Sequence, residues 1–330
     1  MSQLSERAAA LSAVLQAGEG WIGEGTLCRM LGHSRPELMA AVAELQGEGF
    51  PVRSVHGLGV RWKPWPEEYD LAELAALSGM KVCLFDQTGS TNEVARQLLA
   101  QGEAGPVLVV ADAQTAGRGR MGRAFSSPAG TGIYMSLLLT DQRVLTHSGL
   151  ITAAASVLVG SSIQELTGVW PRIKWINDLY LEGGKLCGIL TEGVAGGESG
   201  TLSGVIVGIG INFRTDLSQL PQEVAETAAT LADRLPMGLT RSDLIGSIAW
   251  GMVQKLPGFL ESRSFLPEYR RQSCVLGRRV RVFPAGGEPY EALAVAIDED
   301  AALIVEGPQG RQRLSTGEIS IRFLEKEDLL

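Results

Sequence analysis

The chain of 330 residues has few of the side chains that bind soft metal ions, with only three histidines and four cysteines. Cys28, Cys83, Cys187 and Cys274 lie far apart, and no two of them form a Cys-x-x-Cys pair. Structural zinc sites need such clustered ligands, so we expect no metal site of this kind.

Three further features are missing. The net charge is −8, so no overall basic field attracts nucleic acid or an anionic membrane. The first 16 residues, MSQLSERAAALSAVLQ, contain acid and base early and do not predict a signal peptide. The longest apolar run, residues 150–160, is too short to cross a bilayer. We therefore expect a cytoplasmic protein in a reducing compartment, without membrane contact.

A hydrophobic content of 45% over this length predicts two or three globular domains. Residues 1–65 show three helical patterns and then an alternating hairpin pattern, which is the order of a winged helix-turn-helix. Ser34 and Glu37 predict a capping box for the third helix. The proline-rich, charged stretch 63–70 is typical of a linker.

The rest of the chain changes character once more. Residues 66–272 mix strand and helix patterns, which favours a mixed sheet over a strict βαβ series. Residues 273–330 contain short strands at regular spacing, typical of a small β-barrel. The fold class predicted for the whole chain is α+β.

One stretch, QTAGRGRMGRAF at 114–125, concentrates positive charge without any acidic residue. Gly117, Gly119 and Gly122 match G-x-G-x-x-G, but the strand pattern ends several residues earlier and no helix follows, which argues against dinucleotide binding. No P-loop lysine is present either.

The arginines of this stretch suit carboxylate and phosphate oxygens, and the glycines let backbone N–H groups approach an anion. The stretch is too rich in glycine for a regular helix or strand, so we expect a loop that orders around an anionic ligand. The alternative is a solvated surface loop.

Two other motifs have both a functional and a structural interpretation. In GSTNEVA, the residues Ser90, Thr91 and Asn92 begin a helix, where they can bind a small polar ligand, or Ser90 and Glu93 can simply form a capping box. In VGIGINF, Gly208 and Gly210 indicate close approach of a ligand or tight packing.

The stretch KWINDLYLEGGKLCGIL predicts a hairpin that turns at Glu-Gly-Gly. Lys185 follows the turn within an apolar sequence, and a desolvated ammonium needs an anion such as a substrate carboxylate or phosphate. Asn177 and Asp178 offer oxygen ligands of the type that Mg²⁺ prefers. The alternative is a surface turn with a solvated lysine.

These motifs occur in the order STN, QTAGRGRMGR, KWINDLYLEGGKLCGIL, GIGIN and GEISIR. Together they resemble the biotin–protein ligases, specifically the BirA-type enzymes with an amino-terminal winged helix. The resemblance covers nearly the whole chain. It implies a winged helix at 1–65, a class II synthetase-like ligase core at 66–272 and an SH3-like barrel at 273–330.

The resemblance implies a reaction in two steps. Biotin attacks the α-phosphate of ATP to form biotinyl-5′-adenylate and pyrophosphate, with Mg²⁺ as the metal. A lysine of a biotin carrier domain, such as that of acetyl-CoA carboxylase, then displaces AMP. The resemblance also implies a homodimer, whose formation a ligand can induce, and a biotin-responsive repressor that binds operator DNA.

The resemblance also implies roles for individual residues. The expected catalytic residues are Arg118, Arg120 and Lys185. The expected biotin contacts are Ser90, Thr91, Asn92, Gln114, Arg118, Gly119, Arg120 and Lys185. The expected ATP or adenylate contacts are Arg118, Arg120, Arg123, Phe125, Asn177, Asn212 and Arg322. Mg²⁺ would bind Asp178 and Asn212, and DNA would bind Ser34, Arg35, Arg53 and Arg61.

The sequence departs from the family pattern in two ways. Ile176 stands where the family usually has proline, for which we expect only a local backbone difference. Residues 1–63 hold six basic and six acidic side chains, a poor basis for phosphate contacts. A ligand-induced dimer could double those contacts, or the domain could serve only the ligase core. The alternative functions are a non-catalytic biotin-sensing regulator and a lipoate or octanoate ligase.

Overall fold

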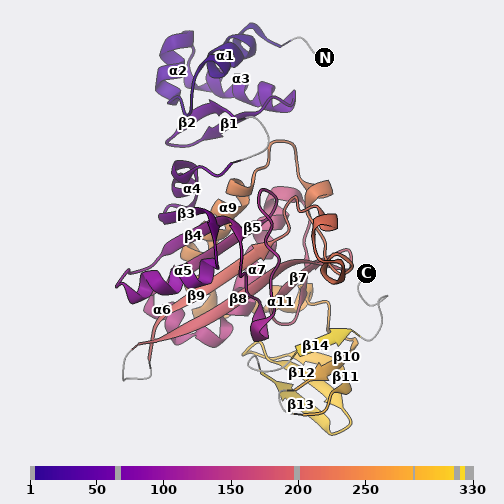
Figure 1. The fold of residues 1–330 in the computed structure, drawn as a ribbon. Coiled ribbons are helices and arrows are strands. Elements are labelled where there is room, and N and C mark those ends of the chain that lie inside the picture. Colours follow the sequence, from indigo (N-terminus) through magenta and orange to yellow (C-terminus); the bar gives the residue numbers. More distant parts are fainter. Residues whose placement is uncertain (1–3, 64–67, 197–200, 285–286, 316–319, 324–330) are drawn as a thin grey trace.

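The computed structural model describes residues 4–63, 68–196, 201–284, 287–315 and 320–323. Three parts follow one another along the chain: an amino-terminal helical domain, a large central sheet with helices, and a small carboxy-terminal sheet (Figure 1). Residues 64–67, in the middle of the stretch 63–70 that the sequence predicted as a linker, lie outside the described residues.

The amino-terminal domain has the predicted order of elements. Helices α1 (Glu6–Ala17), α2 (Glu24–Leu31) and α3 (Arg35–Gly47) are followed by the antiparallel hairpin of β1 (Val52–Val55) and β2 (Gly59–Trp62). The helices bury a small apolar core of their own. The predicted capping box begins α3, where the Ser34 N–H donates to Glu37 Oε2 at 2.9 Å.

The central sheet has seven strands in the order β3-β4-β5-β9-β8-β7-β6. Only the β3–β4 pair is parallel, which confirms the prediction of a mixed sheet. The strands are β3 (Lys81–Thr88), β4 (Val107–Gln114), β5 (Ile133–Leu139), β6 (Arg172–Lys174), β7 (Asp178–Leu181), β8 (Gly184–Gly196) and β9 (Thr201–Ile211).

Helices cover both faces of this sheet, because side chains of alternate strand residues point to opposite faces. Helix α5 packs on the face that presents Val107 and Val109. Helices that include α7 and α9 pack on the opposite face, which presents Leu108 and Val110. The helices are α4 (Leu71–Ser78), α5 (Thr91–Ala100), α6 (Gln142–Thr146), α7 (Ile151–Thr167), α8 (Gln222–Ala225), α9 (Arg241–Gln254), α10 (Leu256–Ser262) and α11 (Leu266–Gln272).

The apolar run of the sequence lies in α7 and the turn before it. The segment Ser148–Thr167 is long and apolar enough to cross a membrane by length and composition, contrary to the estimate from the shorter run. Its most apolar window is 67% buried inside the protein, where α7 packs on α9 and β8. The segment is therefore accounted for as a helix of the protein core.

The carboxy-terminal part is a five-stranded antiparallel sheet in the order β13-β12-β11-β10-β14. Its strands are β10 (Arg279–Phe283), β11 (Tyr290–Ile297), β12 (Leu303–Gly307), β13 (Gly310–Leu314) and β14 (Ser320–Phe323). A bulge between Ala294 and Ala296 interrupts the register of β11. No pairing among the described residues joins the edge strands β13 and β14, so the sequence-predicted closure into a barrel is not observed there.

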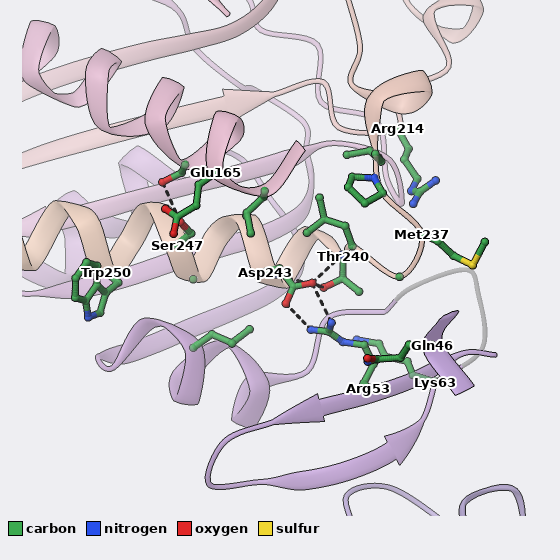
Figure 2. A pocket seen from close by; sticks show the side chains of 18 of the residues that line it. Gln46, Arg53, Lys63, Glu165, Arg214, Met237, Thr240, Asp243, Ser247 and Trp250 are labelled. Atoms are coloured by element: carbon green, nitrogen blue, oxygen red, sulfur yellow. Dashed lines mark hydrogen bonds and ion pairs between the residues drawn. The ribbon is translucent and has the colours of Figure 1, made fainter. Parts of the chain in front are cut away.

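A cluster of ion pairs joins the amino-terminal hairpin to the core. Glu73 of α4 is fully buried and accepts hydrogen bonds from Arg53, Arg61 and Lys63. Arg53 also reaches Asp243 at the start of α9, with N–O distances of 2.7 and 3.0 Å (Figure 2). Burying these charges is tolerable only because each one meets an opposite charge.

This cluster corrects one expectation from the sequence. Arg53 and Arg61 were predicted to contact DNA, but their side chains are only 11% and 12% exposed. Both guanidinium groups are occupied by carboxylates of α4, α9 and the residue that caps α4. Their ion pairs attach the amino-terminal domain to the core.

Candidate active site

The glycine–arginine loop folds back on itself as a tight hairpin. The Gly119 N–H donates to the Arg123 carbonyl at 2.7 Å, and the Phe125 N–H donates to the Gly117 carbonyl at 2.9 Å. A Cβ at Gly117 would lie 2.6 Å from the Phe125 carbonyl oxygen, so this crossing requires glycine. The sequence predicted a loop without regular structure, and these two hydrogen bonds give it the local order of a hairpin.

A small cavity of about 50 Å³ lies beneath this hairpin, at the centre of the sheet. Many of its lining residues were predicted from the sequence: Ser90, Thr91, Asn92, Gln114, Arg118, Gly119, Arg120, Phe125, Asn177 and Lys185. The other lining residues are Met135, Gly188, Ile189, Leu190, Gly208, Ile209 and Gly210. The structure thus brings together three motifs that are distant in the sequence.

The apolar part of this lining was mostly missed by sequence analysis. Met135, Ile189, Leu190 and Ile209 lie on β5, β8 and β9, in runs of apolar residues that look like ordinary sheet core. Sequence analysis could have found these residues only from a pattern that distinguishes the two faces of a strand. These strands have no such pattern, because the residues on both faces are apolar. The strand glycines Gly208 and Gly210 had been noticed as positions of close approach.

Phe125 takes up much of this space. A Cβ at Gly210 would be 2.5 Å from its ring, and a Cβ at Gly188 would be 3.5 Å from it. Pockets that enclose small ligands measure roughly 300 Å³ or more. A vitamin-sized ligand therefore fits only if the aromatic ring moves out of the cavity.

One end of the cavity is a fixed network of polar side chains at the start of α5. Gln114 Oε1 accepts from the Thr91 N–H at 2.9 Å, and its amide donates to the Ser127 hydroxyl at 3.0 Å. The fully buried Ser136 hydroxyl lies 2.7 Å from the Thr91 hydroxyl and donates to Asn92 Oδ1 at 2.6 Å. Ser90 begins α5 without a side-chain capping bond, so the capping box expected there is absent.

Asn92 is oriented from its other side by an acidic residue of β8. Its amide donates to Glu192 Oε2 at 2.6 Å, and Arg96 neutralises the same carboxylate at 2.9 Å. Gly208 makes room for this arrangement, since a Cβ there would lie 2.1 Å from Asn92 Oδ1. The sequence predicted that some group lies close to Gly208, and that group is the side chain of Asn92, which lines the cavity.

The cations lie along the rest of the cavity. Lys185 Nζ is 2.8 Å from Asp178 Oδ1, and Arg120 Nη1 donates to Asn177 Oδ1 at 3.1 Å. Burial lowers the pKa of Arg120 from its usual value, although Asp178 acts in the opposite direction. Arg118 lines the same cavity. An anion that entered would therefore meet the partly desolvated charge of Arg120, where electrostatic attraction is stronger than in water.

Several predicted residues do not line the cavity. Arg123 is exposed, and Asp178 forms an ion pair with Lys185 without lining the cavity itself. Asn212 is buried, and its amide donates to the carbonyls of Lys185 and Ala229 at 3.3 and 3.0 Å. It thereby fixes the backbone that carries Lys185. The Arg322 side chain lies outside the described part of the chain.

Two positions bear on other expectations. The Trp175–Ile176 peptide bond, at the place where the sequence departs from the family pattern, is cis.

In the amino-terminal domain, Ser34 and Arg35 are exposed, with Ser34 bonded to Glu37 and Arg35 paired with Glu24 at 2.6 Å. These surface interactions are weak enough for another anion to replace.

The donor set near the cavity can be compared with the needs of Mg²⁺, which binds one or two carboxylates together with phosphates and water. Asp178 offers one such carboxylate beside the cavity. Asn212 has its amide nitrogen engaged, which leaves only its carbonyl oxygen. The residues fit a metal that is held mainly by substrate phosphates.

A larger cavity, of about 1270 Å³, lies between the amino-terminal domain and helices α7 and α9. Figure 2 shows Arg53 and Lys63 at one end of it and Trp250 at the other. It contains none of the motif residues at 90–92, 114–125 or 177–185. The smaller cavity is therefore the candidate active site.

Comparison with known proteins identifies the family of the chain. Residues 84–212 match the biotin/lipoate A/B protein ligase family, and residues 275–322 match the carboxy-terminal domain of biotin protein ligases. The bifunctional ligase/repressor BirA of Bacillus subtilis is 30% identical over 93% of this chain and 95% of its own length. The biotin–[acetyl-CoA-carboxylase] ligase of Mycobacterium tuberculosis is 33% identical over 67% of this chain and 81% of its own length.

The fold is similar as well. The biotin protein ligase from Aquifex aeolicus in complex with biotin and ATP superimposes with a TM-score of 0.63 and 25% identity, covering 74% of this chain and 99% of that structure. The family assignment rests on two findings. One relative is 30% identical over nearly its full length, and the chain matches both ligase domain families. This chain belongs to the biotin protein ligase family.

Proposed function

We propose that the protein activates biotin with ATP and transfers it to a lysine of a biotin carrier domain. The observation that carries this proposal is the convergence of Arg118, Arg120 and Lys185 with the polar network of Thr91 and Gln114 on one cavity. The relatives named biotin–[acetyl-CoA-carboxylase] ligase support the choice of acyl group and carrier.

In the first step, a biotin carboxylate oxygen bonds to the α-phosphorus of ATP, and the bond to pyrophosphate breaks. Two anions must approach each other, so their repulsion is the main obstacle. Lys185 and Arg120 offset it by donating to the carboxylate and to the phosphate oxygens, where negative charge develops. Asp178 and the substrate phosphates would hold Mg²⁺, which when bound would supply further neutralisation of the triphosphate.

In the second step, the neutral amine of the carrier lysine bonds to the biotinyl carbonyl carbon, and the bond to AMP breaks. The mixed anhydride must be protected from water until the carrier arrives. The hairpin of residues 117–125 lies over the cavity and is suited to this cover, with Phe125 as its apolar contact. Arg118 and Arg120 hold the adenylate phosphate from the same hairpin.

The polar network favours biotin over lipoate as the acid. Thr91, Asn92, Gln114 and Ser90 present donors and acceptors at one end of the cavity. A ureido ring has both N–H and C=O groups that can join this hydrogen-bonded network, whereas a dithiolane ring offers no matching donor or acceptor.

The direct test is pyrophosphate release from ATP with biotin, with lipoate and with no acid. Of these three reactions, only the one with biotin should release pyrophosphate rapidly. Equal release with lipoate would favour a lipoate ligase, and binding of biotin without release would identify a non-catalytic biotin sensor.

A regulatory function is a second proposal, supported by relatives named bifunctional ligase/repressor that match 93–96% of this chain. We propose that residues 1–63 form a winged helix that binds operator DNA as part of a cytoplasmic homodimer, with the exposed start of α3 around Ser34 and Arg35 as the contact. We also propose that the carboxy-terminal sheet is an SH3-like barrel.

A gel shift with upstream DNA of biotin synthesis genes tests this proposal, with and without biotin and ATP. A shift that requires both ligands would support the repressor. No shift under any condition would leave the amino-terminal domain with a role in the ligase core alone.

A further inference from the structure

One buried arginine outside the cavity connects to the segment that carries the hairpin. Arg241 is the first residue of α9, and its side chain is 1% exposed. Its Nη1 donates to Asp112 Oδ1 at 2.6 Å and to the Gly132 carbonyl at 3.2 Å. Its guanidinium also lies over the ring of Tyr69, 4.1 Å from the centroid. Nothing in the proposed chemistry uses this group.

The two acceptors of Arg241 lie at the two ends of one segment. Asp112 stands near the end of β4, and Gly132 directly precedes β5. Between them runs the stretch that contains Arg118, Arg120 and Phe125. Asp112 continues the connection, since its Oδ2 accepts from the Gly130 N–H at 2.9 Å. Arg241 thus clamps the base of the hairpin segment, once directly and once through Asp112.

Both hydrogen bonds leave the same guanidinium nitrogen, Nη1, while the flat face of the group packs on Tyr69. One guanidinium can donate in two directions, to a carboxylate and to a carbonyl, while it also packs on an aromatic face. A lysine keeps the charge but presents a compact ammonium, which is not pre-organised for that geometry. Because the group is almost fully buried, the lost contacts are not replaced by bulk water.

We propose that Arg241 is a positioning residue of the ligase reaction. It touches no substrate, and it does not line the cavity. It holds the ends of residues 112–132 so that the hairpin cations meet the adenylate and the hairpin stays closed over it. The proposal rests on the ligase function proposed above.

The test compares Arg241→Lys with a matched control, Arg270→Lys. Arg270 also joins one carbonyl, Ile297 O at 2.8 Å, and one carboxylate, Glu299 at 2.7 Å, but it does so at the carboxy-terminal sheet. Single-turnover trapping measures how fast preformed biotinyl-adenylate leaves each enzyme. We expect Arg241→Lys to release it at least about tenfold faster than wild type, and Arg270→Lys to match wild type.

Hydrogen–deuterium exchange of the ligand-free proteins gives a second readout that does not depend on activity. Peptides from residues 114–131 should exchange faster in Arg241→Lys, while peptides from β8 and β9 stay unchanged. Asp112→Asn, a substitution at a partly exposed position, should reproduce both effects if Arg241→Lys does not fold.

The outcomes separate the two proposals. A wild-type enzyme that forms no adenylate would overturn the ligase function, and the exchange data would still show whether Arg241 restrains the segment. Normal adenylate release, unchanged exchange in 114–131, or equal changes in Arg270→Lys would each overturn the positioning role.

Discussion

The ring of Phe125 lies so close to Gly210 that a Cβ on the glycine would be 2.5 Å from it. One residue belongs to the arginine hairpin and the other to β9, at the centre of the sheet. The ring occupies the space beneath its own hairpin and leaves a cavity of about 50 Å³. We therefore expect the Phe125 side chain to move when a ligand enters.

This relationship predicts a fluorescence signal from Phe125→Trp. The new indole should be partly buried in the free enzyme, as Phe125 is, and should change environment when biotin and ATP bind. We expect a shift of the emission maximum, after subtraction of the wild-type spectrum, that follows adenylate formation. An identical difference spectrum with and without the ligands would show that the side chain does not move.

Replacing Lys185 tests the electrostatic part of the mechanism. Lys185→Gln removes a cation from the place where charge develops, so adenylate formation should slow by about 10²–10³-fold. Pyrophosphate release under saturating biotin and ATP measures this rate. Lys255→Gln is the control, because Lys255 lies over Trp250 in the larger cavity. A similar loss in both variants would contradict a specific role for Lys185.

The sequence predicted the residues of the site that carry a local signal. The arginines at 118 and 120 stand out against neighbouring glycines, and Lys185 follows a recognisable hairpin turn. Gly208 was noticed because glycine is unusual inside a strand. In each case a few adjacent residues contain the information, so one sequence was enough.

Other features depend on contacts between distant residues, which no local pattern reveals. Arg241 meets Asp112 across 129 positions, and Glu192 orients Asn92 across 100. Arg53 was interpreted as a DNA contact because the sequence does not show that Asp243 faces it. Helix α4 was not predicted beside the presumed linker, although Asp70 caps its start and Gly79 ends it in the left-handed region.

Gly208→Ala should damage the polar network without a change of charge. The added Cβ would lie 2.1 Å from Asn92 Oδ1, so Asn92 must leave Ser136 and Glu192. We expect KM for biotin to rise about tenfold or more, consistent with loss of a buried hydrogen bond. Gly204→Ala is the matched control on β9, where the new methyl meets the flexible end of Leu99. An unchanged KM in Gly208→Ala would argue against biotin contact at this network.

The attachment of the amino-terminal domain should weaken in acid. Burial acts to raise the pKa of Asp70, but the Glu73 N–H and Arg61 outweigh it, and the pKa lies below its usual value. Such a group stabilises the folded state fully above its unfolded pKa of about 3.9, and this contribution is lost as pH falls through the lower folded pKa. Asp70→Asn keeps the cap and removes the charge. The difference in unfolding free energy between wild type and Asp70→Asn should therefore be constant above about pH 5 and shrink as the pH falls below about 4 in urea titrations. A difference that stays constant below about pH 4 would contradict the assignment.

Glu73 is the acid on which the interface between the amino-terminal domain and the core depends most. Its fully buried carboxylate forms ion pairs with Arg53, Arg61 and Lys63. Glu73→Gln removes this negative charge and leaves the three cations only partly neutralised. Breaking a buried ion pair costs about 3 kcal/mol or more, and urea unfolding followed by tryptophan fluorescence should show a loss of this size. The control is Glu103→Gln, which breaks the more exposed pair with Lys81 and should cost less than about 1 kcal/mol. If both substitutions had the same small effect, the cluster would be an ordinary surface network, and the amino-terminal hairpin would be free to separate from the core.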